Sequence, residues 1–370
     1  MSPRSRKTPE AVRAVEAAFD AACGEAAELA TGRRLLLACS AGGDSMTLLD
    51  LAARRGRRRR WELAVVHVDH GQRGESAAEA RFVADQARRR DLECFVTTLD
   101  EELLAASPLS EDVMRQARLT IFKRAAARWH ADAVALAHQA DDRAETFLIR
   151  LLAGSGPTGL ASIRPMERMG GLVLVRPLLA ARREQMRAYL RARELPWRDD
   201  PTNADLGTKR GWVRHRLLPL IRERIGLDPT GRIVRAAELI EGESRAMHEA
   251  AGLILGRIAD RPGEPILERL DLADPLWREA GEALRRQVVR HWLWRLRGRA
   301  LPPGYAALAE AMAFIAARRR GAELRTVERI HVVHTGKALL AFAPATAPDE
   351  RRRAAAPYLP PPRSPKRPRK

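Results

Sequence analysis

Short apolar runs alternate with amphipathic segments through the first half of the chain. The runs are typical of buried strands, and the segments between them carry apolar residues every three to four positions, as helices do. The expected strands are 35–39, 63–68, 94–99, 133–137 and 172–175, and the expected helices are 9–30, 45–55, 76–90, 111–130 and 141–152. Strands that alternate with helices in this way are typical of βαβ units. We therefore predict an α/β, Rossmann-like domain with a parallel sheet over residues 1–225.

The pattern changes in the last third of the chain. Long segments rich in Ala, Arg, Glu and Leu predict helices between residues 230 and 319, and residues 323–343 alternate like a small hairpin. We predict a second, mostly helical α+β domain over residues 230–345. Residues 346–370 are rich in Pro and Arg and hold few apolar residues, so we predict a disordered tail there.

The chain is strongly basic. Its 370 residues include 66 Lys and Arg against 47 Asp and Glu, which gives a net charge of +19. The last twenty residues hold eight Lys or Arg and no acid, so more than half of the excess lies elsewhere. Such a surplus favours a polyanionic partner, and nucleic acid is the first to consider.

The sequence also argues against several classes of protein. No apolar stretch is long enough to span a membrane, and the first residues lack the apolar segment of a signal peptide, so we expect a cytoplasmic protein with no membrane partner. Cys23, Cys39 and Cys94 form no Cys-x-x-Cys pair, which argues against a disulfide framework, a zinc finger or a cluster site. Each cysteine is expected to be a small buried apolar residue.

One segment carries the strongest chemical signal. The strand expected at 35–39 runs directly into residues 40–45, SAGGDS, and a helical pattern follows at once. This arrangement directs backbone N–H groups and the positive end of a helix dipole at one spot, which suits a phosphate or pyrophosphate. No Lys follows the glycines, so this is not a Walker A loop. Ser40 and Ser45 offer hydroxyls to phosphate oxygens, and Asp44 offers a carboxylate to Mg²⁺. The alternative is a glycine turn without a ligand.

Three polar residues, His67, Asp69 and His70, stand at the end of the second expected strand. Because ligands of parallel sheets bind at the carboxyl ends of the strands, we expect these residues to lie beside the glycine loop. They could be zinc ligands, but no fourth ligand is evident in the sequence. We therefore interpret them as a polar cluster on the nucleotide side of the site.

A denser ionisable cluster follows the fourth expected strand and consists of His138, Asp141, Asp142 and Glu145. Asp141 and Glu145 are separated by one helical turn, so their side chains share a face. Helix capping accounts for one Asp at most. The set predicts general acid–base chemistry or Mg²⁺ binding at the carboxyl end of a central strand.

Two groups of basic residues accompany these motifs. Arg115 and Arg118 are one turn apart on the helix expected at 111–130, where they form either a solvated basic face or a phosphate clamp. Arg210 and Arg214 belong to a basic segment that follows a turn-rich stretch, and contact with a phosphate backbone is the natural use of such a segment.

The motifs occur in one order, which gives them a specificity that no single motif has. Together they resemble the tRNA(Ile)-lysidine synthase family of the PP-loop ATP pyrophosphatase superfamily. The motifs that carry the resemblance are SAGGDS, VVHVDHGQR, EDVMRQARLTIFKRAA, LAHQADDRAETFLIRLLAGSGPTGLASI, VRPLL, DDPTN and RHRLLP. The resemblance covers residues 33–222, and a weaker likeness to the tRNA-binding domain of the family extends around 285–294 and the terminal hairpin.

The resemblance implies a PP-loop fold, similar to adenine nucleotide alpha hydrolases, and a ligase reaction. In that reaction ATP activates the wobble cytidine of the isoleucine tRNA with a CAU anticodon. The pyrimidine carbonyl oxygen attacks the α-phosphate and pyrophosphate leaves. The lysine amine then attacks the adenylated carbon, AMP leaves, and lysidine is formed. The implied cofactors are ATP and Mg²⁺, and the implied partners are that tRNA and L-lysine.

The resemblance also assigns roles to single residues. The implied nucleotide-binding residues are Ser40, Ala41, Gly42, Gly43, Asp44, Ser45 and His67, with Asp44 on Mg²⁺; the implied reaction-site residues are Asp44, Arg118, His138, Asp141, Asp142 and Glu145; and the implied tRNA or adenylate contacts are Arg115, Arg210 and Arg214. Two positions depart from the family pattern. Ala41 replaces the usual first Gly of the loop, and a positive φ there would strain it by about 1–2 kcal/mol. Gly211 replaces the Asn that usually follows Arg210, which removes a polar side chain.

Three alternatives stay open at this point. A tRNA 2-thiolation enzyme of the same fold would need paired cysteines, which the sequence does not have. A PP-loop enzyme that acts on a metabolite is disfavoured by the basic charge and by the lack of a glutaminase segment. A non-catalytic RNA-binding relative is compatible with Ala41 but not with an intact acidic cluster. A homodimer is compatible with the sequence, which does not decide the oligomeric state.

Overall fold

The computed structural model describes most of the chain and divides it into two compact units. The units are Met1–Glu241 and Gly242–Lys370. The described residues are 9–69, 76–99, 111–161, 163–169, 171–199, 205–226, 228–296, 303–326 and 330–359. No helix in these ranges is long and apolar enough to cross a membrane.

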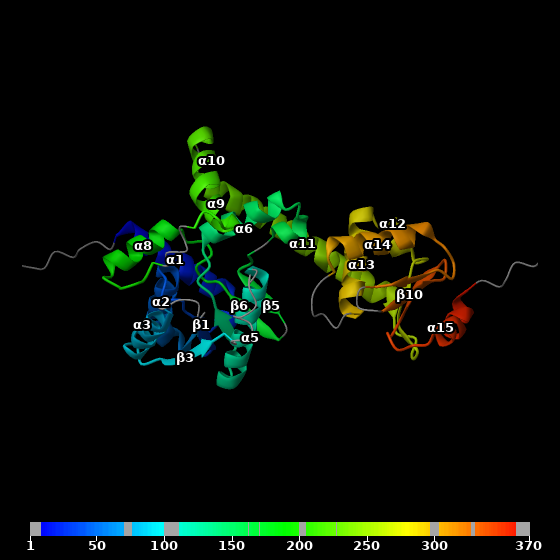
Figure 1. Cartoon of the computed structure of the whole chain (residues 1–370), viewed down its shortest axis with the longest axis horizontal. Coiled ribbons are helices and arrows are strands. Elements are labelled where there is room, and N and C mark those ends of the chain that lie inside the picture. The colour runs from blue at the N-terminus through cyan, green and yellow to red at the C-terminus, as the bar shows by residue number, and fades with distance from the viewer. Residues whose placement is uncertain are drawn as a thin grey trace, which may run out of the picture. The chain divides into compact units, whose positions relative to one another are not determined.

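The first unit is organised around a six-stranded sheet with the order β3-β2-β1-β4-β6-β5 (Figure 1). Its strands are β1 (Arg34–Ala38), β2 (Glu62–Asp69), β3 (Glu93–Thr98), β4 (Ala133–Ala135), β5 (Met166–Met169) and β6 (Leu172–Val175). All neighbours are parallel except β5 and β6, which form an antiparallel edge. The predicted α/β fold and its five strands are confirmed. The sixth strand, β5, was not predicted because its sequence, MERM, is half exposed and lacks an apolar run.

Helices cover both faces of this sheet. They are α1 (Glu10–Glu25), η1 (Ala27–Leu29), α2 (Gly43–Arg59), α3 (Ser76–Arg88), α5 (Glu111–Trp129) and α8 (Arg183–Ala192). Leu35 and Leu37 of β1 pack with α1, α2, α3 and α8, whereas Leu36 packs with Ile121 and Phe122 of α5. This alternation follows from the two-residue period of a strand, and it explains why a central parallel strand is apolar at every position.

The carboxyl side of the sheet is completed by α6 (Ala140–Leu152), which follows β4 directly, and by further helical segments. These are α7 (Pro157–Leu160), α9 (Lys209–Trp212), the π-helical segment η3 (Val213–Leu217), α10 (Leu218–Ile225) and the first part of α11 (Pro229–Ile258). Leu148 of α6 packs against Val213 and Leu218. Arg143, which is 3% exposed, donates to Glu238 and Glu241 at 3.2 and 2.6 Å and so ties α6 to α11.

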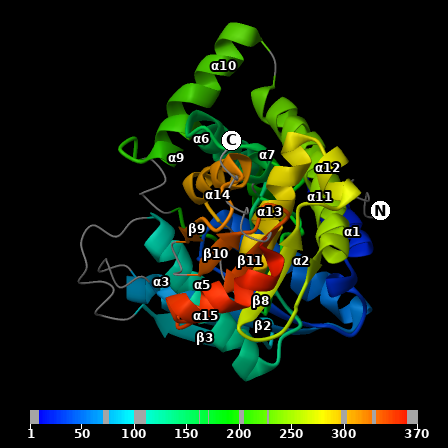
Figure 2. The ribbon, with the colours of Figure 1, turned by 90° about the vertical axis from the view of Figure 1, so that its right-hand side faces the viewer.

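The second unit combines an antiparallel sheet with the second part of α11 and with further helices. Its strands, in the order β7-β8-β11-β10-β9, are β7 (Ala259–Asp260), β8 (Ile266–Asp271), β9 (Glu323–Arg325), β10 (His331–His334) and β11 (Ala338–Phe342), and its further helices include α12 (Pro275–Glu279), α13 (Glu282–Leu296) and α14 (Tyr305–Ala317). Figure 2 shows α13 and α14 beside the sheet, and Trp292 of α13 is buried in their common core. The predicted hairpin is β10 and β11. Strand β8 was missed because it turns Glu268 inward, to Arg295, and Leu267 outward.

The tail that was predicted to be disordered over 346–370 is ordered at its start, so that prediction was wrong for these residues. Helix α15 (Pro348–Ala355) and the 3₁₀ turn η4 (Ala356–Tyr358) follow the sheet. Ala355 is 1% exposed and packs against Phe342 on the sheet face that α13 and α14 leave uncovered. Composition alone missed this contact, because a short helix needs only one or two small apolar residues to dock. Residues 360–370 lie outside the described part.

Candidate active site

The loop after β1 is closed by its own hydrogen bonds. The backbone N–H of Ser40 donates to Oγ of Ser45 at 3.1 Å, and that hydroxyl donates to the carbonyl of Gly42 at 2.9 Å. Gly42 is the N-cap residue in an extended conformation, and α2 begins at Gly43. The amino end of a 17-residue helix therefore opens onto the loop, as expected for a phosphate-binding site.

Ala41 adopts the backbone conformation that its family position suggested. Its φ is +65°, in the left-handed region, and its side chain is 1% exposed. The strain of about 1–2 kcal/mol expected for an L-residue there is therefore present. The carbonyl of Ala41 accepts the N–H of Arg198 at 3.1 Å, which fixes the loop to the segment after α8.

Asp44 connects the loop to the acidic cluster. It lies in the first turn of α2 and is half-buried. Burial, followed by the nearby carboxylate of Asp142, raises the pKa of Asp44 to about 7. The guanidinium groups of Arg183, Arg214 and Arg187 act in the opposite direction and lower this pKa. The start of α2 therefore faces the start of α6, and the two motifs form one site.

The start of α6 is held by a reciprocal cap. The side-chain carbonyl of Gln139 accepts the N–H of Asp141 at 2.5 Å, and the N–H of Gln139 donates to Asp142 at 3.2 Å. One Asp is thus used for capping, as the sequence indicated. The cap fixes both carboxylates at the carboxyl end of β4.

Glu145 is completely buried and bound by arginines. Arg214 of η3 donates to its two oxygens at 2.7 and 2.9 Å, and Arg183 of α8 donates at 3.2 Å. Arg183 also donates to Asp142 at 3.0 Å. Arg210 places its Nε 3.8 Å from Glu145 and donates to the hydroxyl of Thr146 at 3.1 Å. Glu145 therefore orients a set of guanidinium groups, whose charges are satisfied by a carboxylate that water does not reach.

His138 faces a second group of arginines. Its Nδ1 accepts a hydrogen bond from Nε of Arg176 at 3.2 Å. Burial lowers the pKa of His138 to about 3, and the charges of Arg176, Arg210, Arg118 and Arg115 add to this effect in that order. The imidazole is therefore neutral at physiological pH. Arg115 and Arg118 lie close enough to act on it, so the structure brings these two predicted residues near His138.

Comparison with known proteins places this geometry in a family. A family model described as a PP-loop domain matches residues 13–221. A tRNA(Ile)-lysidine synthase of Thermosynechococcus vestitus is 34% identical over 265 residues, which are 72% of this chain and 74% of that protein. The chain belongs to the tRNA(Ile)-lysidine synthase family. The family predicted from the ordered motifs is confirmed.

Other relatives set limits on the likeness. A tRNA(Ile)-lysidine synthase of Symbiobacterium thermophilum is 38% identical over 77% of this chain and 60% of that protein. The chain thus spans about 60% of the length of curated relatives such as this one. Among solved structures, a U34-tRNA thiolase, NcsA from Methanococcus maripaludis, has a TM-score of 0.53 at 16% identity and covers 62% of this chain and 79% of that one. This likeness shows a shared fold alone.

Within this family member, the polar cluster after β2 is only partly described. His67 is 3% exposed, and its Nδ1 lies 2.8 Å from the carbonyl of Cys39, so the ring donates there and leaves Nε2 as an acceptor. Asp69 accepts the hydroxyl of Ser76 at the start of α3. His70 lies outside the described residues. The described residues contain no group of three or more His, Cys, Asp or Glu that could hold a metal ion.

Gly211, the second departure from the family pattern, has a structural cause. A Cβ atom at this position would lie 1.8 Å from the carbonyl oxygen of Asp205, so no side chain fits. The N–H of Gly211 donates to Oγ1 of Thr208, the N-cap residue of α9, at 3.0 Å. The close approach of the Asp205 backbone therefore requires glycine at position 211.

Three arginines of the site were given no role in the sequence analysis: Arg176, which stands in the VRPLL motif, Arg182 and Arg183. Arg176 follows β6 and binds His138, as described. Arg182 lies 3.2 Å from Asp141 and 2.7 Å from Asp228, and the N–H of Arg183 donates to Asp141 at 2.9 Å. Their signal was present, because they stand at the end of a central strand and at the start of the next helix. In a chain this rich in Arg, however, no pair of basic residues is distinctive.

Proposed function

We propose that this protein ligates lysine to the wobble cytidine of the isoleucine tRNA with a CAU anticodon, with release of pyrophosphate and AMP. The observation that carries the proposal is the meeting of the PP loop with the acid–arginine cluster through Asp44 and Asp142. Membership of the tRNA(Ile)-lysidine synthase family supports it. The net charge of +19 is suitable for a tRNA partner.

ATP would bind with its phosphates on the loop of residues 40–45. Backbone N–H groups and the start of α2 provide a positive potential there. The guanidinium groups of Arg183 and Arg214 stand across from Asp44 and add positive charge that carboxylates already hold in place. Fixed charges of this kind stabilise negative charge that develops on a leaving pyrophosphate.

Asp44 is the residue that would hold Mg²⁺. Its carboxylate is half-buried and is destabilised as an anion by its surroundings, which favours a bound cation. Both oxygens of Asp142 are already engaged, one by Arg183 and one by the N–H of Gln139. One protein carboxylate together with phosphate oxygens is a usual set for Mg²⁺. The ion would neutralise phosphate charge when bound.

Two bond-forming steps would take place in this site. In the first, the cytosine carbonyl oxygen attacks the α-phosphate, the bond between the α- and β-phosphates breaks, and pyrophosphate leaves. In the second, the lysine amine attacks the activated ring carbon and loses a proton, and the carbon–oxygen bond to AMP breaks. We assign Glu145 to holding Arg183 and Arg214 rather than to deprotonating lysine, because both of its oxygens are bound by arginine.

The other basic residues near the site and the second unit are assigned to binding the tRNA or the adenylate. Arg115, Arg118 and Arg210 surround the neutral His138 and would contact phosphates of the tRNA or the adenylate. The second unit would hold the tRNA. A homodimer and a cytoplasmic location stay predictions.

The thiolation alternative is not favoured. Burial raises the pKa of Cys94 to about 11 and also raises the pKa of Cys39, so neither thiol is activated. The described part of the chain contains no group of three or more His, Cys, Asp or Glu that could hold a metal ion.

The deciding experiment is incorporation of labelled lysine. The protein is incubated with ATP, Mg²⁺ and ¹⁴C-lysine, and with transcripts of the CAU isoleucine tRNA or of methionine tRNA, which has the same anticodon. We expect label in the isoleucine tRNA only, with one pyrophosphate released per lysine. Protein that binds ATP and tRNA but incorporates no lysine into either transcript would disprove the proposed function.

A further inference from the structure

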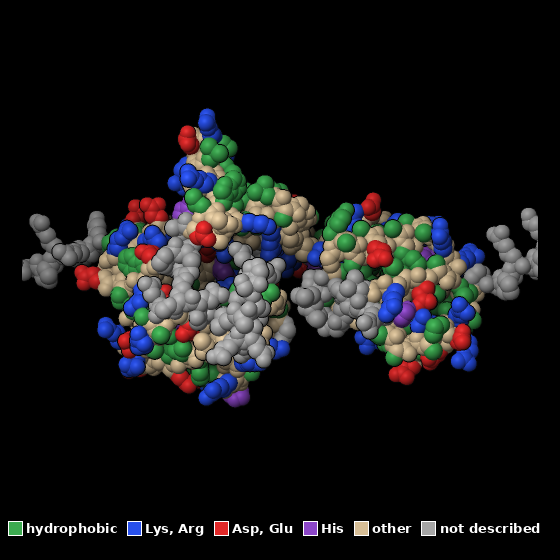
Figure 3. All heavy atoms as spheres, in the orientation of Figure 1, with side chains coloured by type: hydrophobic (Ala, Val, Ile, Leu, Met, Phe, Trp, Pro, Cys, Tyr) green, Lys and Arg blue, Asp and Glu red, His purple; other side chains and the backbone are tan. Residues whose placement is uncertain are grey.

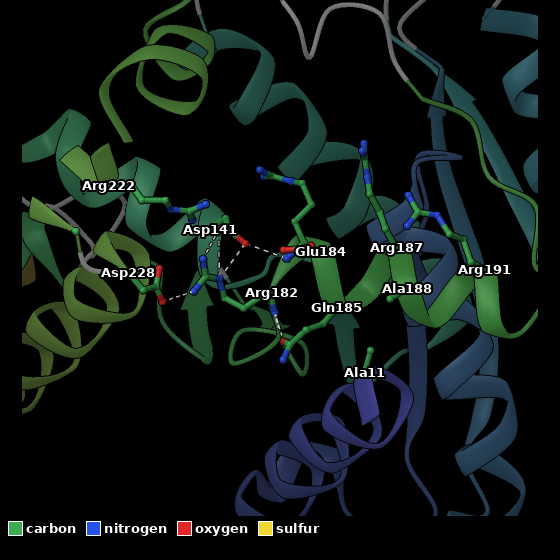
Figure 4. Close-up of a pocket in the computed structure, with 12 residues that line it drawn as sticks. Ala11, Asp141, Arg182, Glu184, Gln185, Arg187, Ala188, Arg191, Arg222 and Asp228 are labelled. Atoms are coloured by element: carbon green, nitrogen blue, oxygen red, sulfur yellow. Dashed lines mark hydrogen bonds and ion pairs between the residues drawn. The ribbon is translucent and has the colours of Figure 1, made fainter. Parts of the chain in front are cut away.

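A pocket of about 920 Å³ borders the candidate active site and is dominated by arginine. It lies among α1, α6, α8, α10 and the segment that precedes α11 (Figure 4). Its arginines are Arg182, Arg183, Arg187, Arg191 and Arg222. The acids in its lining are fewer: Asp141, Glu184 and Asp228. The pocket therefore carries a surplus of positive charge beyond the reaction site itself.

The arginines differ in how their charges are matched. Arg182 and Arg183, at the inner end, bind the carboxylates described above. Arg187 lies 2.9 Å from Asp199, but both side chains are exposed, and such a pair contributes little. Arg191 and Arg222 are exposed and, among the described residues, have no ion-pair partner within 4.0 Å. Figure 3 shows that basic side chains also gather around α10 on the face of this unit that it displays.

The arginines of α8 form a row. Arg183, Arg187 and Arg191 are four residues apart, so they form one row along the helix, beside the buried Met186 and Leu190. The row spans about 12 Å along the helix axis. Like charges one turn apart destabilise a helix. An anionic ligand along the row would remove this repulsion.

We propose that this pocket is a phosphate-binding track for the backbone of the substrate tRNA, separate from the PP loop, and this inference rests on the proposed function. The row begins at Arg183, which touches the reaction site, and leads along α8 to Arg191, whereas Arg222 of α10 borders the pocket on the side of Asp141 and Asp228 (Figure 4). A strand whose wobble base enters the site must place neighbouring phosphates along such a path. A single pyrophosphate is the other source of the same chemistry, but it is too short to engage both ends of the row.

The test removes the two arginines that take no part in the reaction site. In the double variant R191Q/R222Q we expect the Kd for tRNA to rise about tenfold and the slope of log Kd against log salt to fall by about 1.5. The kcat for lysine incorporation at saturating tRNA should stay unchanged while KM for tRNA rises. The double variant R191K/R222K keeps the charges and should keep the salt slope.

A matched control removes two exposed arginines elsewhere. The variant R57Q/R58Q loses the same charge at the far end of α2, about 20 Å along the helix from the PP loop, and should change tRNA affinity less than twofold. An equal loss of tRNA affinity in R57Q/R58Q and R191Q/R222Q would overturn the proposed phosphate-binding track, because net charge alone would then explain the loss. An unchanged Kd in R191Q/R222Q, with unchanged thermal unfolding, would overturn it as well.

Inhibition by added pyrophosphate distinguishes the two possible ligands of the pocket. Inhibition of wild-type and R191Q/R222Q protein by added pyrophosphate should be the same within twofold. Weaker inhibition of the variant with unchanged tRNA affinity would assign the pocket to pyrophosphate and overturn the track. Failure of the proposed function would look different, because wild-type protein would then incorporate no lysine. The tRNA affinities of R191Q/R222Q and R57Q/R58Q could still be compared in that case.

Discussion

The PP loop and the cluster at the start of α6 serve one site but are built from different parts of the chain. The loop is formed within six consecutive residues, 40–45, and two hydrogen bonds inside it close its shape. The cluster is formed by side chains, and Arg214 reaches Glu145 from 69 positions away. A site made of backbone is therefore visible in a short motif, whereas a site made of ion pairs depends on the whole fold.

Asp44 joins the two regions, and its replacement should have the largest effect. We expect Asp44→Asn to lower pyrophosphate release at least a hundredfold, because the site loses the carboxylate that would hold Mg²⁺ against the phosphates. Binding of tRNA should change less than twofold. Pyrophosphate release and tRNA binding are measured separately, with Asp85→Asn on the exposed surface of α3 as the control. Parallel loss of both properties in Asp44→Asn would contradict the division between chemistry and tRNA binding.

Glu145→Ala tests the side-chain region alone. The variant leaves Arg183 and Arg214 without their buried acceptor, and breaking such a pair costs about 3–5 kcal/mol of unfolding free energy. Glu62→Ala is the matched control, because it removes an ion pair with Arg34 that is largely exposed and should cost under about 1 kcal/mol. Urea denaturation measures both. If Glu145→Ala lowers the free energy of unfolding by as little as Glu62→Ala does, Glu145 does not hold the arginines in place.

The same contrast explains what could be predicted from the sequence. The strands, the loop and the acids of α6 were predicted because their signals lie within ten or so neighbouring residues. Arg176 and Arg183 were not, because their partners are brought near only by the crossover from β4 to β6 and by the packing of α8 on α2. Their long-range ion pairs leave no local pattern.

Fold elements were missed for a related reason. β5 is half exposed and polar, and β8 turns a charged residue inward, so neither has the apolar alternation that predicts a strand. α15 docks through Ala355 on a sheet face that no local pattern predicts to be covered. In each case the tertiary neighbour, not the local sequence, decides the structure.

The lowered pKa of His138 can be tested through the pH dependence of protein stability. Its pKa is about 3 in the folded protein and about 6.5 when unfolded, so between these values the unfolded chain binds the extra proton. This group therefore makes stability rise with pH, by up to about 1.4 kcal/mol per pH unit, and stability is lost as pH falls from 6.5 towards 3. His138→Gln should remove this part of the slope. Urea denaturation at pH 4.5 and 6.5 compares the two proteins, and equal slopes would show that burial and the nearby arginines do not keep His138 neutral.

Ala41→Gly tests the backbone region and should have the smallest effect. Glycine removes the strain of about 1–2 kcal/mol at a φ of +65°, but it loses the buried methyl group and gains entropy when unfolded. We expect a net stabilisation of about 0.5 kcal/mol and pyrophosphate release within twofold of wild type. Ala30→Gly, at a φ of −63°, is the control and should destabilise by about 0.5–1 kcal/mol. If urea denaturation shows that Ala41→Gly raises the free energy of unfolding and Ala30→Gly lowers it, the loop holds its phosphate-binding shape against local strain. Destabilisation by both substitutions would mean that the packing of the Ala41 methyl group outweighs that strain.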